Sequence, residues 1–181
     1  MKTNLSRIKK RHKTCLQLFD ETEDINYAME EDSITSLFEC EGFKDYEQIA
    51  DFCLNNNIKK VYDIGCAFGH QSEIFLEKNI NYVGINDCKL NFWNDDKFQY
   101  IVQDYPFNIE DTKNALAISR LCLGWNCYLY EGEKTFKEQF LQLSKDFQHC
   151  LLHIPSKNIN FVNQYFANYK KIYEELIYFN H

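Results

Sequence analysis

The chain has 181 residues, of which 45% are hydrophobic and 26% are charged, which is enough apolar material for one domain with a sizeable core. Aromatic residues make up 16% of the chain, and there are only six glycines and two prolines. This composition excludes a disordered, collagen-like or linker-rich protein. The formal net charge is −7.

The charge is distributed unevenly along the chain. Residues 1–13 carry six Lys or Arg and no acidic residue, a charge of +6, whereas the other 168 residues carry 14 basic and 27 acidic side chains. Nucleic acid is not supported as a partner, because binding a phosphate backbone needs clustered Lys and Arg on the body of the protein. A short run of basic residues at a chain end is more typical of a solvated, frayed end than of a contact with an anionic partner. The charge pattern is also compatible with a protein partner.

Several features bear on the compartment. The apolar runs fall short of the ~20 residues that span a bilayer, and no apolar segment with a cleavage site follows the basic N-terminus, so no signal peptide is predicted. Without a secretory signal, the eight cysteines indicate free buried thiols rather than a disulfide framework. We therefore predict a cytoplasmic protein that does not contact a membrane.

The first 58 residues are predicted to form a helical N-terminal extension that packs on the core. Apolar residues three and four positions apart predict a helix over residues 5–19. The acidic stretch 20–32 indicates a loop or a helix start, and 33–39 a short helix. A further helix begins near residue 46 and ends at the asparagine triplet 55–57.

From residue 59 onward, short apolar runs alternate with helical stretches. Strands are predicted at 61–64, 82–85, 98–102, 116–118 and 150–154, with a last strand or pair of strands within 172–179. Helices are predicted at 71–78, 135–147 and 160–167. This alternation predicts an α/β domain with an open, largely parallel sheet that occupies residues 59–181.

The most informative segment runs from Asp63 to Gly69 and leaves a predicted strand to enter a helix. Gly65 and Gly69 have no Cβ, and Ala67 has little more, so the backbone can approach a ligand closely. The segment lacks the G-x-G-x-x-G pattern of dinucleotide-binding proteins. Asp63 is predicted to hold a cationic amino group, directly or through water.

This segment resembles the first motif of the class I S-adenosylmethionine-dependent methyltransferases, which reads acid-x-Gly-x-Gly-x-Gly. Asp63, Gly65 and Gly69 match it, and Ala67 replaces the middle glycine. The resemblance covers residues 59 to about 155. It implies a Rossmann-like methyltransferase sheet flanked by helices, with S-adenosylmethionine bound at the carboxyl ends of the first strands by the turn, including Cys66.

Two later positions extend the resemblance. Asn86 stands where the family usually has an acid for the ribose hydroxyls, and Asp87 follows it. Asn86 can hydrogen-bond a hydroxyl but carries no charge. Asp104, after the third predicted strand, is implied to contact the adenine amino group, and Tyr105 to cover the adenine face. The competing interpretation is a strand–glycine–helix turn that serves only as a structural joint.

Three further side chains, those of Arg120, Trp125 and His70, each have one functional and one structural interpretation. Arg120 is either a clamp for an anionic substrate or an ion-pair partner, and Trp125 either stacks on a substrate or fills the core. His70 is either an active-site base or part of a helix start. No metal is predicted, because the spacing of the cysteines and histidines that could form a zinc site is unusual: Cys122, Cys127, His149 and His153.

These features predict a methyltransferase that uses S-adenosylmethionine on an unidentified small-molecule or macromolecular acceptor. The alternative is a methyltransferase-like protein without turnover, which acts as a cofactor-binding or protein-interaction module. The departures at Ala67 and Asn86 and the lack of an evident catalytic residue keep this alternative open. Release of S-adenosylhomocysteine distinguishes the two.

Overall fold

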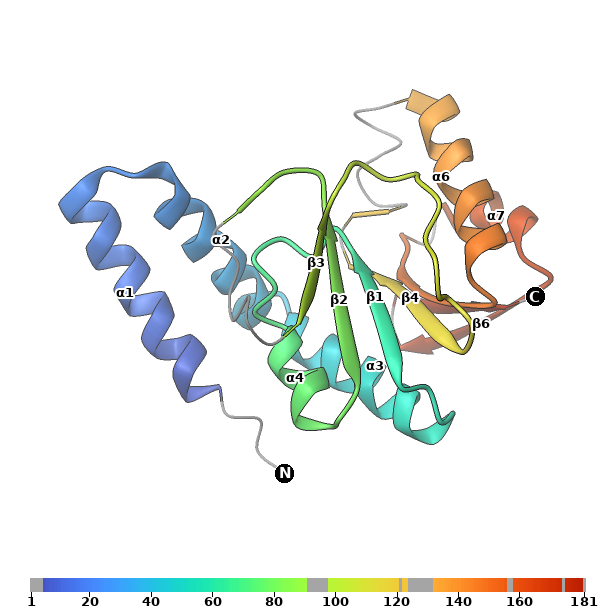
Figure 1. The fold of residues 1–181 in the computed structure, drawn as a ribbon, viewed down its shortest axis with the longest axis horizontal. Coiled ribbons are helices and arrows are strands. Elements are labelled where there is room, and N and C mark those ends of the chain that lie inside the picture. The colour runs from blue at the N-terminus through green and yellow to red at the C-terminus, as the bar shows by residue number, and fades with distance from the viewer. Residues whose placement is uncertain are drawn as a thin grey trace.

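The structure is a computed structural model that describes residues 5–90, 98–120, 122–123, 132–155, 158–173 and 175–180. Figure 1 shows a central twisted sheet with helices on both sides. The helices are α1 (Ser6–Thr22), α2 (Ile25–Glu39), α3 (Gly42–Asn55), α4 (Ser72–Glu77), α6 (Gly132–Asp146) and α7 (Ile159–Val162), which continues as a 3-10 turn (Asn163–Tyr165). The strands are β1 (Lys60–Ile64), β2 (Asn81–Asn86), β3 (Gln99–Val102), β4 (Ala115–Ser119), β5 (His149–His153), β6 (Asn168–Tyr173) and β7 (Leu176–Asn180).

The seven strands form one sheet in the order β3-β2-β1-β4-β5-β7-β6. Strands β1 to β5 pair in parallel, and β7 pairs antiparallel with both β5 and β6. The chain builds outward from β1 to β3 and then crosses to β4, which places the switch point of the sheet between β1 and β4. An open sheet of this kind binds its ligand at the carboxyl ends of the strands beside that point. The predicted, largely parallel Rossmann-like sheet is confirmed, and its last segment is a pair of strands.

The sheet separates two apolar clusters. On one side, α6 and α7 cover a cluster that includes Tyr62 and Ile64, and on the other, α1 to α4 cover a cluster that includes Val61. Neighbouring residues of β1 face opposite sides because side chains alternate along a strand. The second cluster contains residues from the N-terminal helices and from the strands alike, so both halves of the chain contribute to it.

The N-terminal extension consists of α1 and α2 side by side, followed by α3 (Figure 1). The helix α2 begins at Ile25 because the Asp24 side chain accepts a hydrogen bond from the Asn26 backbone N–H at 3.0 Å. It is therefore twice as long as the helix predicted over 33–39. The basic arm was predicted to be frayed, but from Ser6 onward it is helix. Residues 1–4 lie outside the described part.

Seven of the eight cysteines lie in the described part of the chain, and all seven are free thiols. Cys15, Cys53, Cys66 and Cys150 are buried, as predicted, whereas Cys40 and Cys88 are exposed and Cys122 is half-buried. The prediction that the thiols are buried is thus wrong for the last three. Among the described helices, none is both long and apolar enough to cross a membrane.

Candidate functional site

Two cavities lie at the carboxyl ends of the parallel strands. The larger has a volume of about 470 Å³ and lies between the turn that follows β1 and the helix α2. The smaller, of about 120 Å³, lies between the ends of β1 and β2 and residues 103–105 after β3. Gly65, Asn86 and Cys122 line both cavities, so the two cavities adjoin at these residues.

The turn after β1 has an unusual backbone. Gly65 has a φ of 81° and Gly69 a φ of 76°, and Ala67 between them also has a positive φ, of 48°. Glycine adopts this region freely, whereas a residue with a Cβ does so at a cost. Gly65, Cys66 and Ala67 line the larger cavity, and Gly69 lines neither.

The space above the two glycines is occupied by other side chains of the protein. A Cβ at Gly65 would collide with the Sγ and Cβ of Cys122. A Cβ at Gly69 would collide with the Tyr100 hydroxyl, which donates a hydrogen bond to the Phe68 carbonyl at 2.9 Å. Gly69 therefore lets Tyr100 of β3 pack closely against the turn, and its contact with the cofactor stays a prediction.

Asp63 lies beneath the turn and is fully buried. Its Oδ2 accepts hydrogen bonds from the Tyr82 hydroxyl at 2.6 Å and from the Gln71 Nε2 at 2.7 Å. Burial raises the pKa of Asp63 to about 6, against hydrogen bonds from Tyr82, Gln71 and Tyr46 and the charge of Arg120, which lower it. Asp63 does not line either cavity, whereas Gln71 lines the larger one.

The predicted adenosyl-binding residues gather at the smaller cavity. Asp87, Asp104 and Tyr105 line it, and Asn86 stands where it meets the larger cavity. The Asn86 Nδ2 donates to the Cys88 carbonyl at 3.2 Å, which leaves its carbonyl oxygen as the group for a ligand hydroxyl. Asp87 and Asp104 are exposed, and Tyr105 is buried.

Arg120 follows β4 and forms a buried ion pair. Its Nε donates to the Asp45 Oδ2 at 2.8 Å, and one terminal nitrogen donates to the Cys40 carbonyl at 2.5 Å. These contacts tie the end of β4 to the C-terminal end of α2 and the first turn of α3, and Arg120 also lines the larger cavity. The predicted ion pair of Arg120 is thus present, and its role as a clamp for an anionic substrate stays a prediction. Trp125, also predicted at the substrate site, lies outside the described residues.

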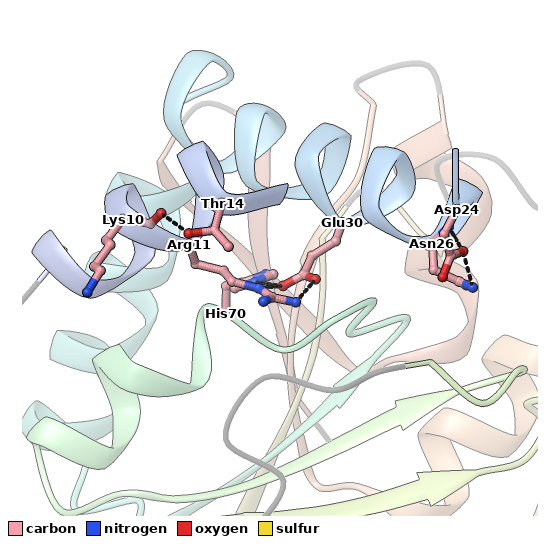
Figure 2. A network of polar contacts seen from close by, with 7 residues as sticks. All are labelled: Lys10, Arg11, Thr14, Asp24, Asn26, Glu30 and His70. Atoms are coloured by element: carbon pink, nitrogen blue, oxygen red, sulfur yellow. Dashed lines mark hydrogen bonds and ion pairs between the residues drawn. The ribbon is translucent and has the colours of Figure 1, made fainter. Parts of the chain in front are cut away.

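His70 is held in a buried polar network. Its Nε2 lies 3.0 Å from the Glu30 Oε1, and Arg11 donates to both Glu30 oxygens at 2.8 and 2.6 Å. Figure 2 shows Arg11 of α1 and His70 of the turn both reaching the carboxylate of Glu30 on α2. Although burial raises the pKa of Glu30, the bonds from His70 and Arg11 outweigh it and lower that pKa to about 2. His70 thus fastens the N-terminal helices to the glycine turn, as part of a helix start rather than as an exposed base.

One face of α2 forms the outer wall of the larger cavity. The residues on this face are spaced as one stripe of a helix: Met29, Asp32, Ser33, Ser36 and Leu37. The sequence places Ser33, Ser36 and Leu37 in a predicted helix, whereas Met29 and Asp32 fall in the stretch 20–32, where a loop or a helix start is predicted. The full length of the helix was not predicted because the stripe mixes polar and apolar residues. A capping Asp at position 24 was the available signal for an earlier helix start.

The two histidines of the possible zinc site, His149 and His153, contact other side chains. The His149 Nδ1 lies 2.6 Å from the Tyr178 hydroxyl, and the His153 Nε2 lies 3.8 Å from a Glu175 oxygen. Cys127 lies outside the described residues. Within the described ranges, no group of three or more His, Cys, Asp or Glu side chains is arranged to hold a metal ion.

This sheet order, with helices on both faces and a helical N-terminal region, is the fold of the class I methyltransferases. The solved structures most useful for comparison are all distant in sequence. The N-methyltransferase NodS from Bradyrhizobium japonicum, solved with S-adenosylhomocysteine, matches with a TM-score of 0.55 at 11% identity over 80% of this chain and 87% of its own. The 16S rRNA methylase RmtB matches with a TM-score of 0.53 at 16% identity over 95% of this chain and 75% of its own.

A third solved structure, monomeric WbdD, matches with a TM-score of 0.55 at 20% identity over 74% of this chain. WbdD is described as a bifunctional kinase-methyltransferase, and the match spans only 39% of its length. No protein-family model matches the sequence, and a search of curated proteins found no match. The similarity to known proteins is therefore a similarity of fold.

Proposed function

We propose that this protein binds S-adenosylmethionine across the two cavities and transfers its methyl group to an acceptor that enters beside α2. The observation that carries this proposal is the pair of cavities that meet at Gly65, Asn86 and Cys122, at the switch point of a class I methyltransferase sheet. NodS, which has the same fold, binds S-adenosylhomocysteine. When bound, the cofactor supplies an electrophilic methyl group.

The residues present fit the two ends of this cofactor. Asp87, Asp104 and the Asn86 carbonyl offer acceptors at the smaller cavity, where the ribose hydroxyls and the adenine amino group are donors. Tyr105 provides an aromatic wall there. Gly65, Cys66 and Ala67 bring the backbone to the larger cavity, where the methionine end is expected.

The acceptor is not specified by these residues. NodS and RmtB share the fold, but one is an N-methyltransferase and the other a 16S rRNA methylase. We expect the acceptor to contact the cavity-facing stripe of α2, because this stripe is the wall opposite the glycine turn. Methyl transfer requires an acceptor atom in line with the methyl group, so the wall acts mainly through positioning.

Ligand-dependent stabilisation tests the proposal. S-adenosylmethionine or S-adenosylhomocysteine at ~100 times the dissociation constant adds about 2.7 kcal/mol to the unfolding free energy. The melting temperature then rises by roughly 5–11 °C, since each kcal/mol shifts it by roughly 2–4 °C in a domain of this size. NAD and ATP are the controls and should leave it unchanged. A melting temperature insensitive to millimolar amounts of both adenosyl ligands would contradict the proposal.

The alternative without turnover retains the same pocket. The left-handed Ala67 and the uncharged Asn86 are the features that favour it, because both depart from the methyltransferase pattern. Incubation with S-adenosylmethionine and candidate acceptors separates the two. Release of S-adenosylhomocysteine above the acceptor-free rate supports the enzyme, and binding without release supports the module.

A further inference from the structure

The face of α2 that lines the larger cavity carries three polar side chains, those of Asp32, Ser33 and Ser36. Ser36 lies four residues after Asp32 and three after Ser33, so the three side chains are neighbours on one side of the helix. Asp32 is exposed, and the two serines are half-buried. Within the described part of the chain, no hydrogen bond or ion pair engages any of these side chains. Their polar atoms are therefore available to a molecule in the cavity.

Two polar side chains elsewhere in the lining of this cavity are already engaged by the protein. The Gln71 amide donates to the Asp63 carboxylate at 2.7 Å and to the Cys66 carbonyl at 2.9 Å. The Arg120 guanidinium is paired with Asp45 at 2.8 Å. Unlike these groups, the polar side chains of α2 make no contact within the protein that accounts for their place in the wall.

The charges around the two cavities favour a positively charged ligand group at α2. The described lining of both cavities contains no Lys or His, and its one Arg, Arg120, is neutralised by Asp45. Its acidic side chains are Asp32 at the larger cavity and Asp87 and Asp104 at the smaller one. A carboxylate or phosphate group beside Asp32 would be repelled, whereas an ammonium would be attracted.

We propose that Asp32, Ser33 and Ser36 form the acceptor site of the methyltransferase, and that the acceptor is a small aliphatic amine. An ammonium has three N–H donors, for which the carboxylate and the two serine hydroxyls are acceptors. Met29 and Leu37 belong to the same stripe and offer an apolar surface to the carbon chain of the amine. The cavity of about 470 Å³ has the size of a small-molecule site. This inference rests on the proposed function, because it assigns the acceptor class for the same site.

The charge changes of the reaction give Asp32 a role beyond binding. The amine first loses a proton to water. Its nitrogen lone pair then forms the new N–C bond while the C–S bond breaks and leaves its electron pair on sulfur. The positive charge thus passes from sulfur to the acceptor nitrogen, and the product is a methylammonium. A carboxylate beside the nitrogen stabilises this charge as it develops.

Ligands that reach from the cofactor site toward α2 test the proposal without knowledge of the natural acceptor. They are analogues of S-adenosylhomocysteine in which nitrogen replaces sulfur and carries an arm of two to four carbons. The arm ends in a methyl, an ammonium or a carboxylate group. The reference ligands are S-adenosylhomocysteine, which has no arm, and 5′-methylthioadenosine, which has the adenosine and thioether but lacks the amino acid group as well. Calorimetry measures each dissociation constant.

We expect the best ammonium arm to bind about fivefold or more tightly than the methyl arm of the same length, because it forms a charge-assisted hydrogen bond with Asp32. Asp32→Asn should reduce this ratio to about twofold or less and leave both reference ligands within about twofold of wild type. The carboxylate arm should bind wild type more weakly than the methyl arm does, and Asp32→Asn should remove that difference. High salt should reduce the preference for the ammonium arm, because Asp32 is exposed.

Glu39→Gln is the matched control. Glu39 is also an exposed acidic residue of α2, but it lines neither cavity. The substitution removes the same charge from the same helix, and the ratio of the ammonium arm to the methyl arm should stay within about twofold of wild type. If Glu39→Gln abolishes the preference as fully as Asp32→Asn does, the preference reflects the overall charge of the protein, and the site at Asp32 is overturned.

Failure of this inference and failure of the proposed function give different results. If wild type binds neither S-adenosylhomocysteine nor any of its analogues, the proposed function is wrong. If it binds S-adenosylhomocysteine but prefers the ammonium arm at no length, the amine acceptor is overturned and the cofactor site stands. A preference for the carboxylate arm also overturns the amine acceptor, and it supports Arg120 as a clamp for an anionic substrate. The comparison of arms in wild type decides the acceptor class even without the variants.

Discussion

Three residues of the turn after β1 have positive φ angles. The effect of a substitution on stability and ligand binding depends on the atoms that surround the substituted residue. At Gly65, a new Cβ meets both strain and the Cys122 side chain. We expect Gly65→Ala to lower the unfolding free energy by about 1–3 kcal/mol and to weaken S-adenosylhomocysteine binding, because the turn must move. Urea denaturation and calorimetry measure the two effects.

A second substitution separates the collision from the strain. Gly65→Ala in a Cys122→Gly background removes the atoms that the new Cβ would strike. About half or more of the lost stability should return, measured against Cys122→Gly alone. No recovery would mean that the positive φ, rather than Cys122, makes glycine necessary at this position.

Asp63 gives the protein a pH dependence of defined sign. Its folded-state pKa is raised from 3.8 to about 6, so the folded protein binds a proton more tightly than the unfolded chain in this range. Stability from this group therefore increases as the pH falls from about 6 toward 4, and it is lost as the pH rises. Between pH 7.5 and pH 4.5 the change is about 2 kcal/mol.

Comparison with Asp63→Asn isolates this contribution, because the other titrating groups, His70 and Glu30 included, are present in both proteins. The difference in unfolding free energy, variant minus wild type, should fall by about 2 kcal/mol between pH 7.5 and pH 4.5. A difference that stays constant over this range would show that Asp63 has an ordinary pKa.

Among the helices, α1 and α2 depend on one buried carboxylate for their attachment to the turn. Glu30→Gln leaves Arg11 without its anion and weakens the contact with His70 (Figure 2). We expect a loss of about 3 kcal/mol, because breaking a buried pair leaves an uncompensated charge. The melting temperature should fall by roughly 6–12 °C.

The matched control is an exposed ion pair of α1. Arg7 reaches Glu73 at 3.2 Å with 46% of its side chain exposed, so Arg7→Gln should cost less than ~1 kcal/mol. Equal effects of Glu30→Gln and Arg7→Gln would show that the buried network adds no more than a surface pair.

Across the whole chain, the sequence is informative where one physical effect dominates. The strands β1, β2 and β4 were predictable because their apolar runs are buried on both sides of the sheet, and the turn at Gly65 because only small residues fit it. The order of the strands in the sheet could be predicted only from the resemblance to class I methyltransferases. The start of α2 was missed because that helix faces the core with Glu30 and the cavity with Asp32, which disguises its apolar stripe. The contact between Gln71 and Asp63 depends on geometry that spacing does not specify.

The lining residues of the two cavities predict which parts of the chain each end of the ligand protects from hydrogen exchange. S-adenosylhomocysteine reaches both cavities, so hydrogen exchange should slow in α2 over residues 29–37, in the turn 65–71 and in the segment 103–105. Methylthioadenosine should protect 103–105 and leave 29–37 unchanged, because it does not fill the larger cavity. A ligand that binds only the closed form lowers the local opening equilibrium by a factor that grows with the ratio of its concentration to its dissociation constant.

The edge strand β6 and its neighbour β7 are the internal control, since they lie at the far end of the sheet from β3 and line neither cavity. Their locally exchanging amides should be unaffected by both ligands. Equal protection of 29–37 by the two ligands would mean that α2 closes on the adenosine end. In that case the wall that we assign to the acceptor belongs instead to the adenosine site, and the two cavities must be exchanged in the proposal.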